Sequence, residues 1–530
     1  MKRTRIFILG VIIPCALALS GCFNWFKKKE QDIVVDLPSI EVVSTLKLNL
    51  QGRTEKSLFP SLSNNSIKNP EFSYVSSDKS VATIDASGVV RALKVGSTNV
   101  TITLKTNSSV KKDVKVNVVD APVEHYDYTI MFYMCASDLE YDSNEEPDKQ
   151  HPYISEDILE ILSVHDIPES VKIIIQTGGT TKWSLPGSYL IDASKISSTN
   201  LQRWEVDNAL NKLRLVETLP TNHMASESSF TEFLSWGLDD YEADQMGIVF
   251  SGHGGGIAGC AFDDNYTVKV GNDFWQRTLR TFEVAKAAKT ALSNSSKEKF
   301  TWIGYDCCIM QCADIATINS DYFDYMVASQ ENESAIGWNH DVYLPYLKAN
   351  TKIAPKDFLP KICDAFLLDK HREDEFGENT CYQTLSVLDL SKAADLVTKF
   401  NNFCESVGYG RVLYDIAKLA FERSYNNFGD KLFGLCDFVS LMNEFEKINP
   451  LYDTESIIAS IESLVYYSKN CSKYHTDPCG VNAFFPEKMD SNNKYMLQVG
   501  KEDYANSLST KFTKWQDVCV AHGEFGWNAI

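Results

Sequence analysis

Apolar and polar residues alternate along the early part of the chain, between Ile40 and Val119. Short segments with this two-residue period recur, and Gly88 and Gly96 lie between them, where turns need a backbone that accepts positive φ. The segments are residues 46–50, 81–84, 89–93, 100–104 and 114–118. This spacing predicts a small β-sandwich.

A second pattern begins after Asp120-Ala121-Pro122, where short apolar runs alternate with longer amphipathic stretches. The runs predict buried strands at residues 128–135, 171–176, 247–250, 301–305 and 325–328. The stretches predict helices at residues 154–162, 229–238, 281–292 and 312–318, and Ser229 with Glu232 forms a candidate capping box for the second of these. Strand–helix alternation of this kind predicts a parallel sheet covered by helices on both faces.

Beyond residue 350 the pattern becomes mostly helical. Helices are expected at residues 397–407, 413–422 and 456–467, with a late strand at residues 481–486. The predicted fold class is therefore α/β, with a mostly parallel sheet sandwiched by helices, a helical C-terminal extension and a preceding small all-β sandwich.

The amino terminus has the composition of a targeting segment. Lys2, Arg3 and Arg5 precede an apolar stretch at residues 6–19, which is too short to span a bilayer comfortably. The stretch ends in Leu19-Ser20-Gly21-Cys22, which resembles a bacterial lipobox. We therefore expect a signal peptide at residues 1–21, lipidation of Cys22 and a tether at residues 22–38. A plain secretory signal is the alternative.

This interpretation places the protein on a bacterial membrane, facing the cell surface or the periplasm. The formal net charge of −20 argues against a nucleic-acid partner, which requires a basic surface. The same acidity would attract cationic substrates, although it also serves solubility alone. No Cys-x-x-Cys is paired with a second one at zinc spacing, so no structural zinc is expected.

Reactive side chains follow two of the predicted strands. His253 stands among Gly252, Gly254, Gly255 and Gly256, and Asp306-Cys307-Cys308 follows the next strand along the chain. Because parallel strands deliver the residues that follow them to one sheet edge, an imidazole and a thiol are expected to face each other there. That combination is typical of a cysteine hydrolase. A phosphate-binding loop is the weaker interpretation, since no Gly-x-Gly-x-x-Gly or Gly-Lys-Ser/Thr is present.

The two regions resemble known families. Residues 76–90, which read Ser-Ser-Asp-Lys-Ser-Val-Ala-Thr-Ile-Asp-Ala-Ser-Gly-Val-Val, look like a bacterial Ig-like domain of group 2. Ser-Gly-His-Gly-Gly-Gly followed by Tyr-Asp-Cys-Cys-Ile-Met resembles the clostripain family of cysteine peptidases, which are relatives of caspases. These resemblances imply an Ig-like domain at residues 39–120 and a caspase-like peptidase domain at residues 124–530.

The clostripain resemblance also implies roles for individual residues. By position, Cys308 is the nucleophile, His253 the catalytic histidine and Cys307 a packing residue. Asp306 is the first candidate for binding a basic P1 side chain, and Glu331 and Glu333 are weaker ones. The N–H groups of Gly254 and Cys308 are the candidate oxyanion hole.

The expected activity is thus that of a membrane-anchored endopeptidase that cleaves peptides or proteins after Arg or Lys. The alternative is a non-catalytic adhesion lipoprotein in which the Ig-like domain does the binding, and another Cys/His acyl transferase is a weaker option. No cofactor is expected. Calcium is considered only for Asp263-Asp264-Asn265, which alone do not make a site. Some clostripain relatives cleave themselves between the histidine and cysteine segments, where this chain has Lys269, Arg277 and Arg280.

Overall fold

The structure is a computed structural model of the whole chain. It describes residues 38–62, 67, 70–122, 124–146, 149–219, 221, 223–270, 273–367, 383–426, 428, 434–471, 477–486 and 511–522, and the side chains of residues 268–275 are not described. The predicted signal peptide, Cys22 and nearly all of the predicted tether lie outside these ranges. Among the described residues, no helix is long and apolar enough to cross a membrane.

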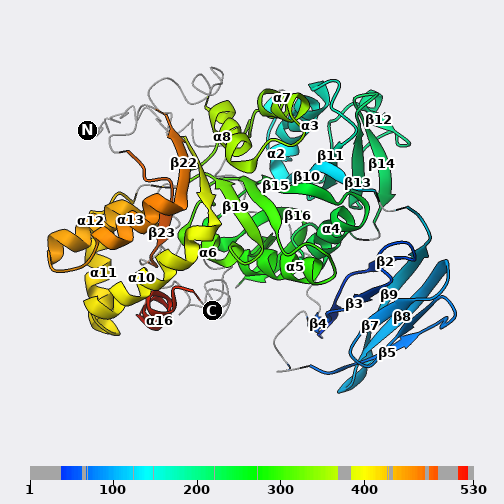
Figure 1. Cartoon of the computed structure of the whole chain (residues 1–530), viewed down its shortest axis with the longest axis horizontal. Coiled ribbons are helices and arrows are strands. Elements are labelled where there is room, and N and C mark those ends of the chain that lie inside the picture. The colour runs from blue at the N-terminus through cyan, green and yellow to red at the C-terminus, as the bar shows by residue number, and fades with distance from the viewer. Residues whose placement is uncertain are drawn as a thin grey trace, which may run out of the picture.

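A ten-stranded sheet forms the centre of the larger domain (Figure 1). Five neighbouring strands are parallel, in the order β11-β10-β15-β18-β19. Their bounds are β10 Tyr126–Cys135, β11 Val171–Gly178, β15 Ala243–Gly252, β18 Phe300–Asp306 and β19 Phe323–Ala328. All five predicted strands are present, which confirms the predicted α/β class.

Further strands extend this sheet at both edges through antiparallel pairs, apart from one parallel pair at the outermost position of the first edge. They are β12 Leu190–Ile191, β13 Gln202–Asp207 and β14 Lys212–Thr218 on one side, and β20 Thr384–Asp389 and β22 Val465–Asn470 on the other. The β22 strand corrects the predicted helix at residues 456–467, because helix α13 ends at Leu464 and the chain then becomes extended. Residues 465–470 alternate in burial, as expected of an edge strand with one covered face.

Helices cover both faces of the sheet and produce two separate apolar cores. One core lies under α3 Tyr153–Ser163, α7 His340–Ala349 and α8 Pro355–Phe366. The other lies under α4 Glu227–Asp240, α5 Thr281–Ser293 and α6 Ala313–Asn319 and continues into the C-terminal helices. Successive residues of a strand pack into opposite cores, since Phe132 lies in the first core and Tyr133 in the second.

The predicted capping box at the start of α4 is wrong. The helix begins at Glu227, with Ser226 at the N-cap, so Ser229 already lies inside it. The Glu232 carboxylate accepts instead from the backbone N–H of Ser44, which belongs to the preceding all-β region. A long-range partner has thus replaced the local one that the sequence spacing suggested.

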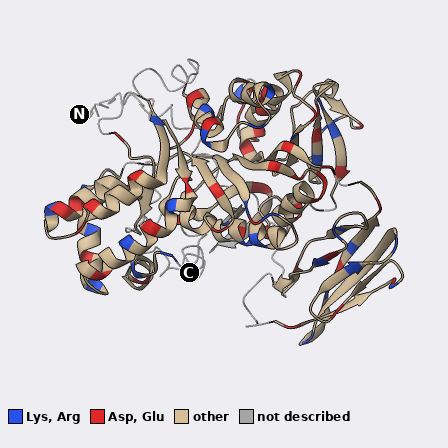
Figure 2. Cartoon of the chain, viewed as in Figure 1, with Lys and Arg blue, Asp and Glu red and all other residues tan. Residues whose placement is uncertain are grey.

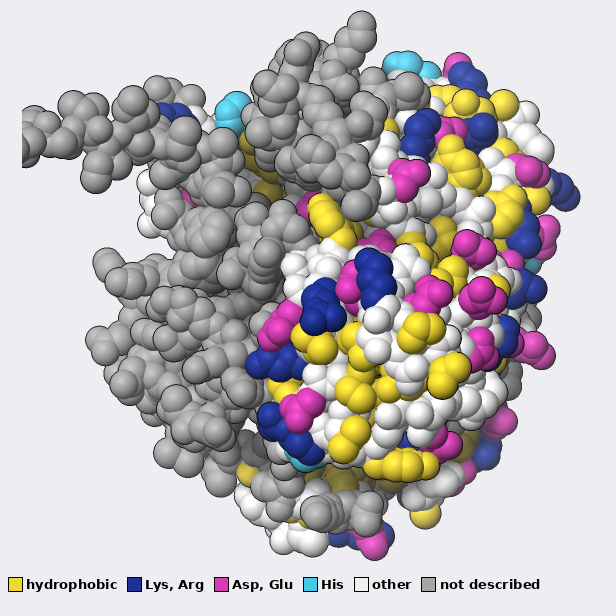
Figure 3. Space-filling model, turned by 90° about the vertical axis from the view of Figure 1, so that its left-hand side faces the viewer, with side chains coloured by type: hydrophobic (Ala, Val, Ile, Leu, Met, Phe, Trp, Pro, Cys, Tyr) yellow, Lys and Arg dark blue, Asp and Glu magenta, His cyan; other side chains and the backbone are white. Residues whose placement is uncertain are grey.

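The C-terminal extension is mainly helical, as predicted. Its elements are α10 Ala393–Val407, α11 Arg411–Arg423, α12 Phe438–Ile448, α13 Glu455–Leu464 and α16 Thr513–His522, with a small sheet of β21 Leu435–Asp437 and β23 Asn482–Phe484. The side of the molecule shown in Figure 3 carries acidic, basic and apolar side chains next to one another.

The Ig-like region is a separate all-β unit with its own apolar core. A four-stranded sheet, β2-β9-β8-β5, packs on a three-stranded sheet, β3-β7-β6, while β1 pairs with β4. The bounds are β1 Ile40–Glu41, β2 Thr45–Asn49, β3 Glu55–Ser57, β4 Ser61–Leu62, β5 Phe72–Ser76, β6 Ala82–Ile84, β7 Val89–Ala92, β8 Gly96–Leu104 and β9 Asn107–Val119. Inward residues such as Val100, Ile102 and Val116 are fully buried, as the two-residue period predicts.

Candidate active site

Strand register places His253 and Cys308 at matching positions on neighbouring strands. β15 and β18 run parallel, and Ser251 is paired with Asp306. His253 and Cys308 each follow two residues beyond this last pair. The two sequence-predicted residues therefore leave the same edge of the sheet side by side.

The loops that carry these two residues are in direct contact. A Cβ atom added to Gly254 would lie 2.3 Å from the carbonyl oxygen of Cys308 and 2.9 Å from the Cβ of Cys307. Only glycine permits such a close approach of two backbones. The glycines around His253 thus bring its loop against the cysteine loop.

Asp138 is a third side chain at this edge that the sequence reasoning missed. His253 Nε2 lies 2.8 Å from Asp138 Oδ1, and the exposed fractions of the two side chains are 5% and 14%. Asp138 lies in the short helix α2 Ser137–Glu140, directly after β10, whose last residue Cys135 is paired with Gly252 of β15. Because a carboxylate only accepts hydrogen bonds, Nε2 is the protonated nitrogen in this contact, and the lone pair of the neutral ring lies on Nδ1.

The two adjacent cysteines have different surroundings. Cys307 is buried with its Sγ directed at the Phe250 carbonyl oxygen, and burial raises the pKa of its thiol well above the ordinary value. Cys308 is only partly buried, and its Sγ accepts from the backbone N–H of Glu333 at 3.4 Å. A thiol that is partly accessible and accepts an N–H bond suits a nucleophile better than one enclosed in apolar surroundings.

The turn after Cys308 is strained. Ile309 has φ of +54°, a region that β-branched residues rarely adopt. Its backbone N–H donates to the Glu331 carbonyl oxygen at 3.0 Å, which holds the turn in place. The strained turn at Ile309 therefore changes the direction of the backbone immediately after Cys308.

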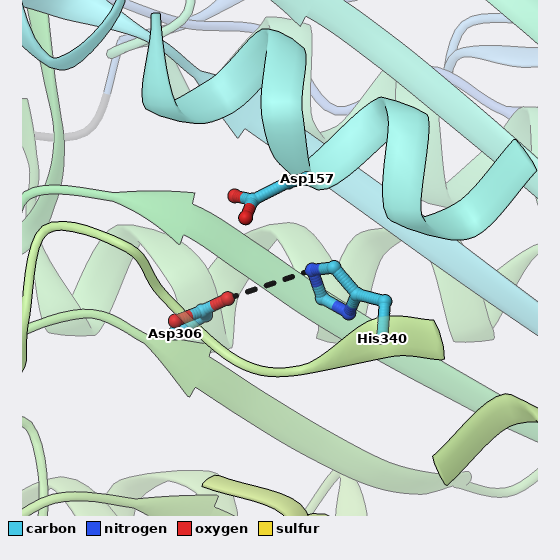
Figure 4. Close-up of side chains that lie close together, drawn as sticks. All are labelled: Asp157, Asp306 and His340. Carbon is cyan, nitrogen blue, oxygen red and sulfur yellow. Dashed lines mark ion pairs between the residues drawn. The ribbon is translucent and has the colours of Figure 1, made fainter. Parts of the chain in front are cut away.

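Asp306 lies beneath the cysteine loop in a buried group with Asp157 and His340 (Figure 4). Asp306 Oδ2 accepts from the Trp338 N–H at 3.0 Å and lies 3.7 Å from His340 Nε2. One donor atom from each of these three side chains lies within 4.8 Å of the others. The predicted specificity residue therefore already has partners inside the protein.

The backbone at Gly337 closes this buried group from one side. Gly337 has φ of +73°, and a Cβ there would approach Asp306 Oδ2 to 3.1 Å and Asp157 Oδ1 to 3.2 Å. A larger residue would be strained in conformation and would press on both carboxylates. The Gly337–Trp338 segment is thus fitted to the cluster.

The other predicted acidic residues lie on the segment after β19. Glu331 is 8% exposed, and its Oε1 accepts from the Asn332 N–H, while its carbonyl oxygen holds Ile309. Glu333 is also 8% exposed and contacts Cys308 through its backbone. Both residues thus border the cysteine loop, and the backbone of Glu333 contacts the thiol directly.

One calcium candidate and one self-cleavage candidate have partners in the described chain, whereas the side chain of Lys269 lies outside the described residues. Asp263 accepts from the backbone N–H groups of Met224 and Asn265, and burial raises its pKa to about 6. Arg277 lies in strand β17 Asp273–Leu279, which pairs with β16 Cys260–Val270, and forms an ion pair with Glu283 at 2.6 Å. Cleavage after Arg277 would require this hairpin to open.

Comparisons with known proteins agree with this architecture. The clostripain family model matches residues 132–519, and the bacterial Ig-like domain (group 2) model matches residues 39–114. No curated protein matches the chain. A secreted C11 cysteine protease of Bacteroides thetaiotaomicron, "iotapain", is similar in fold, with a TM-score of 0.50 and 16% identity over 73% of this chain and 100% of that one. An inactive zymogen C11 protease of Parabacteroides distasonis gives a TM-score of 0.48 at 15% identity, over 73% of this chain and 97% of that one. The family model spans most of the larger domain, including both strand ends described above, and the chain therefore belongs to the clostripain family of cysteine proteases.

Proposed function

We propose that this protease is an endopeptidase that uses Cys308 as nucleophile and His253 as general acid and base. The observation that supports this most strongly is the strand register, in which Ser251 pairs with Asp306. His253 and Cys308 each come two residues after this pair. The contact between Gly254 and the Cys308 carbonyl adds to it.

In the proposed reaction, His253 takes the thiol proton of Cys308, and the sulfur attacks the carbonyl carbon of the scissile peptide bond. The C–N bond then breaks as the imidazolium donates its proton to the leaving amine, which leaves a thioester on Cys308. His253 next takes a proton from water, which attacks the thioester. The C–S bond breaks to release the acid, and the imidazolium returns its proton to the sulfur of Cys308, which restores the thiol. Asp138, at 2.8 Å from Nε2, holds the ring in one orientation through these steps.

The negative oxygen formed by each attack requires hydrogen-bond donors. We propose the backbone N–H groups of Gly254 and Cys308 for this task, because both lie at the edge of the sheet where the two loops touch. Neither group depends on side-chain chemistry, so substitutions of neighbouring side chains would leave it in place.

For specificity we propose Arg or Lys at P1, with Asp306 and Glu331 as the acids that favour the positive charge. The Asp306 side chain is 2% exposed, so direct pairing requires the Trp338 segment or the His340 ring to give way. The variants Asp306→Asn and Glu331→Gln show whether each acid pairs with the P1 side chain or only positions neighbouring groups. An acid that pairs with P1 affects Arg and Lys substrates only, whereas a positioning acid lowers kcat for every P1 residue.

The activity is tested with fluorogenic peptides that carry Arg, Lys or Asp at P1, before and after limited proteolysis of the protein. We expect turnover of the Arg and Lys peptides, abolished in Cys308→Ala and His253→Ala and retained in Cys307→Ala. Loss of turnover in Cys307→Ala with retention in Cys308→Ala would reverse the assignment. Absence of any turnover would favour the adhesion alternative.

We also propose that Cys22 carries a lipid that anchors the protein to a membrane outside the cytoplasm. The supporting feature is the Leu19-Ser20-Gly21-Cys22 sequence after a short apolar stretch. Mass spectrometry of the amino-terminal peptide from membrane fractions tests it. Wild-type protein should carry an acylated residue 22, and Cys22→Ser should appear in the soluble fraction; unmodified Cys22 would refute the anchor.

A further inference from the structure

The Ig-like domain contacts the peptidase domain through a buried lysine. Lys56 of β3 forms an ion pair with Asp239 near the end of α4, and its side chain is only 3% exposed. Lys47 of β2 pairs with the next residue, Asp240. A buried ammonium group is costly unless it is paired, so this contact specifies one arrangement of the two domains.

Uncharged hydrogen bonds link the same strand to the neighbouring helix. The backbone N–H of Ser57 donates to Asn294 Oδ1 at 2.9 Å, and Asn294 Nδ2 donates back to the Ser57 carbonyl oxygen at 3.0 Å. Asn294 is the C-cap of α5. The Ig-like domain therefore holds the ends of both α4 and α5, beside which it lies in Figure 1.

The contact area between the two domains is incompletely filled. A cavity of about 560 Å³ lies between the domains and is lined by residues of both, including Lys56, Arg203 and Glu232. Figure 2 shows acidic and basic positions interspersed on the elements that meet there. Charged contacts border this cavity, and the partly exposed Lys47–Asp240 pair among them weakens as salt rises.

The two helices held in this way lead to the two proposed catalytic loops. α4 ends at Asp240, and β15, which delivers His253, begins at Ala243. α5 ends at Ser293, and β18, which delivers Cys308, begins at Phe300. Both helices pack in the same apolar core as these strands. Movement of the helix ends would therefore reach the starts of both strands.

We propose that the Ig-like domain is a docked brace of the peptidase domain, fixed by the Lys56–Asp239 ion pair and the Ser57–Asn294 hydrogen bonds, and not an independent spacer. The brace holds α4 and α5 and thereby fixes the orientation of the catalytic edge relative to the Ig-like domain. The docking itself does not depend on the roles proposed for His253 and Cys308.

The proposal is tested on the full chain with Lys56→Met, Asp239→Asn and the double variant. The matched control is Lys105→Met, which removes a lysine of the same domain whose ion pair with Glu71 is exposed. We expect each single interface variant to lower the apparent midpoint of thermal unfolding by roughly 5 °C or more, because one buried charge loses its partner. The double variant should lose less than the sum of the single losses, and the control should change little.

Hydrogen–deuterium exchange gives a readout that does not require activity. Backbone amides near the end of α4 should exchange faster in Lys56→Met and faster in high salt, with the fold of the Ig-like domain preserved. Asn294→Ala, a milder change, keeps the test decisive if the lysine variant fails to fold, and it should increase exchange at the end of α5. Unchanged exchange and an unchanged midpoint in these variants would show that the domains move independently and would overturn the proposal. Failure of the proposed catalytic residues would leave these results unaffected.

Discussion

Replacement of Asp138 by Asn tests the catalytic geometry most directly. The Asp138 carboxylate accepts from His253 Nε2 at 2.8 Å, and both side chains are largely buried. Asn has nearly the same shape but no charge, and its NH₂ group can take the place of the accepting oxygen. Asp138→Asn therefore removes the fixed anion opposite the ring and weakens the preference for one tautomer.

The expected magnitude is set by the type of contact. A buried hydrogen bond to a charged group contributes about 1.5–3 kcal/mol. Since each 1.36 kcal/mol of barrier is tenfold in rate, kcat should fall by about 10- to 150-fold. KM should change little, because Asp138 is proposed to contact His253 and not the substrate.

The assay is steady-state turnover of an Arg peptide, together with the rate of Cys308 alkylation by iodoacetamide. The chain offers a matched control in His125 and Asp244, which form an equally short pair at 2.8 Å with side chains 53% and 58% exposed. Asp244→Asn should leave both rates unchanged. A normal kcat in Asp138→Asn, or a raised KM with normal kcat, would refute the positioning role.

Three further predictions concern neighbouring groups. Iodoacetamide should modify Cys308 well before Cys307 in the folded protein, because Cys307 is buried and burial raises its thiol pKa. Peptide mass mapping measures the two rates, and equal labelling of both cysteines would contradict the assignment of Cys308 as nucleophile. Burial raises the pKa of Glu140 from its ordinary value of 4.5 to about 7, so its contribution to stability is complete below pH 4.5 and is lost as pH rises through 7. Between pH 4.5 and pH 7, the free energy of unfolding should therefore fall by about 3 kcal/mol more in wild type than in Glu140→Gln. Guanidinium titrations at several pH values measure this, and an equal dependence of the two proteins on pH would refute it. His340→Asn should lower the free energy of unfolding by about 2–4 kcal/mol, because it removes the 2.7 Å bond to Tyr343 and the imidazole beside a buried carboxylate, and an unchanged midpoint would contradict it.

Strand positions and the proposed dyad were predictable because they depend on local pattern and one geometric rule. The run at 171–175 is β-branched and fully apolar apart from Lys172, which is typical of a central strand, and it became β11. Neighbouring parallel strands end at one edge of the sheet, and this rule predicted that His253 and the Cys307–Cys308 pair follow adjacent strand ends, while the choice of Cys308 came from the clostripain resemblance. Neither inference needed long-range information.

Other features depend on contacts that the sequence pattern does not show. Asp138 lies in a four-residue helix with no periodicity, entered through Ser137 at φ of +39°. A search for polar residues after every predicted strand would have found it, since it comes shortly after β10. No such rule exists for Asp157 and His340, which come from two helices that meet only when the fold is complete.

The burial of Asp306 changes how its place beside the cysteines is understood. The clostripain resemblance implied a substrate-binding acid at this position, two residues before the proposed nucleophile. The parallel pairing with Ser251, however, makes Asp306 the last paired residue of β18, and its side chain points into the protein toward His340 and the Trp338 N–H. A strand-end residue of this kind fixes where the following loop begins. Any effect of Asp306 on basic substrates must therefore be separated from its effect on the position of Cys308, and only a comparison across P1 residues makes that separation.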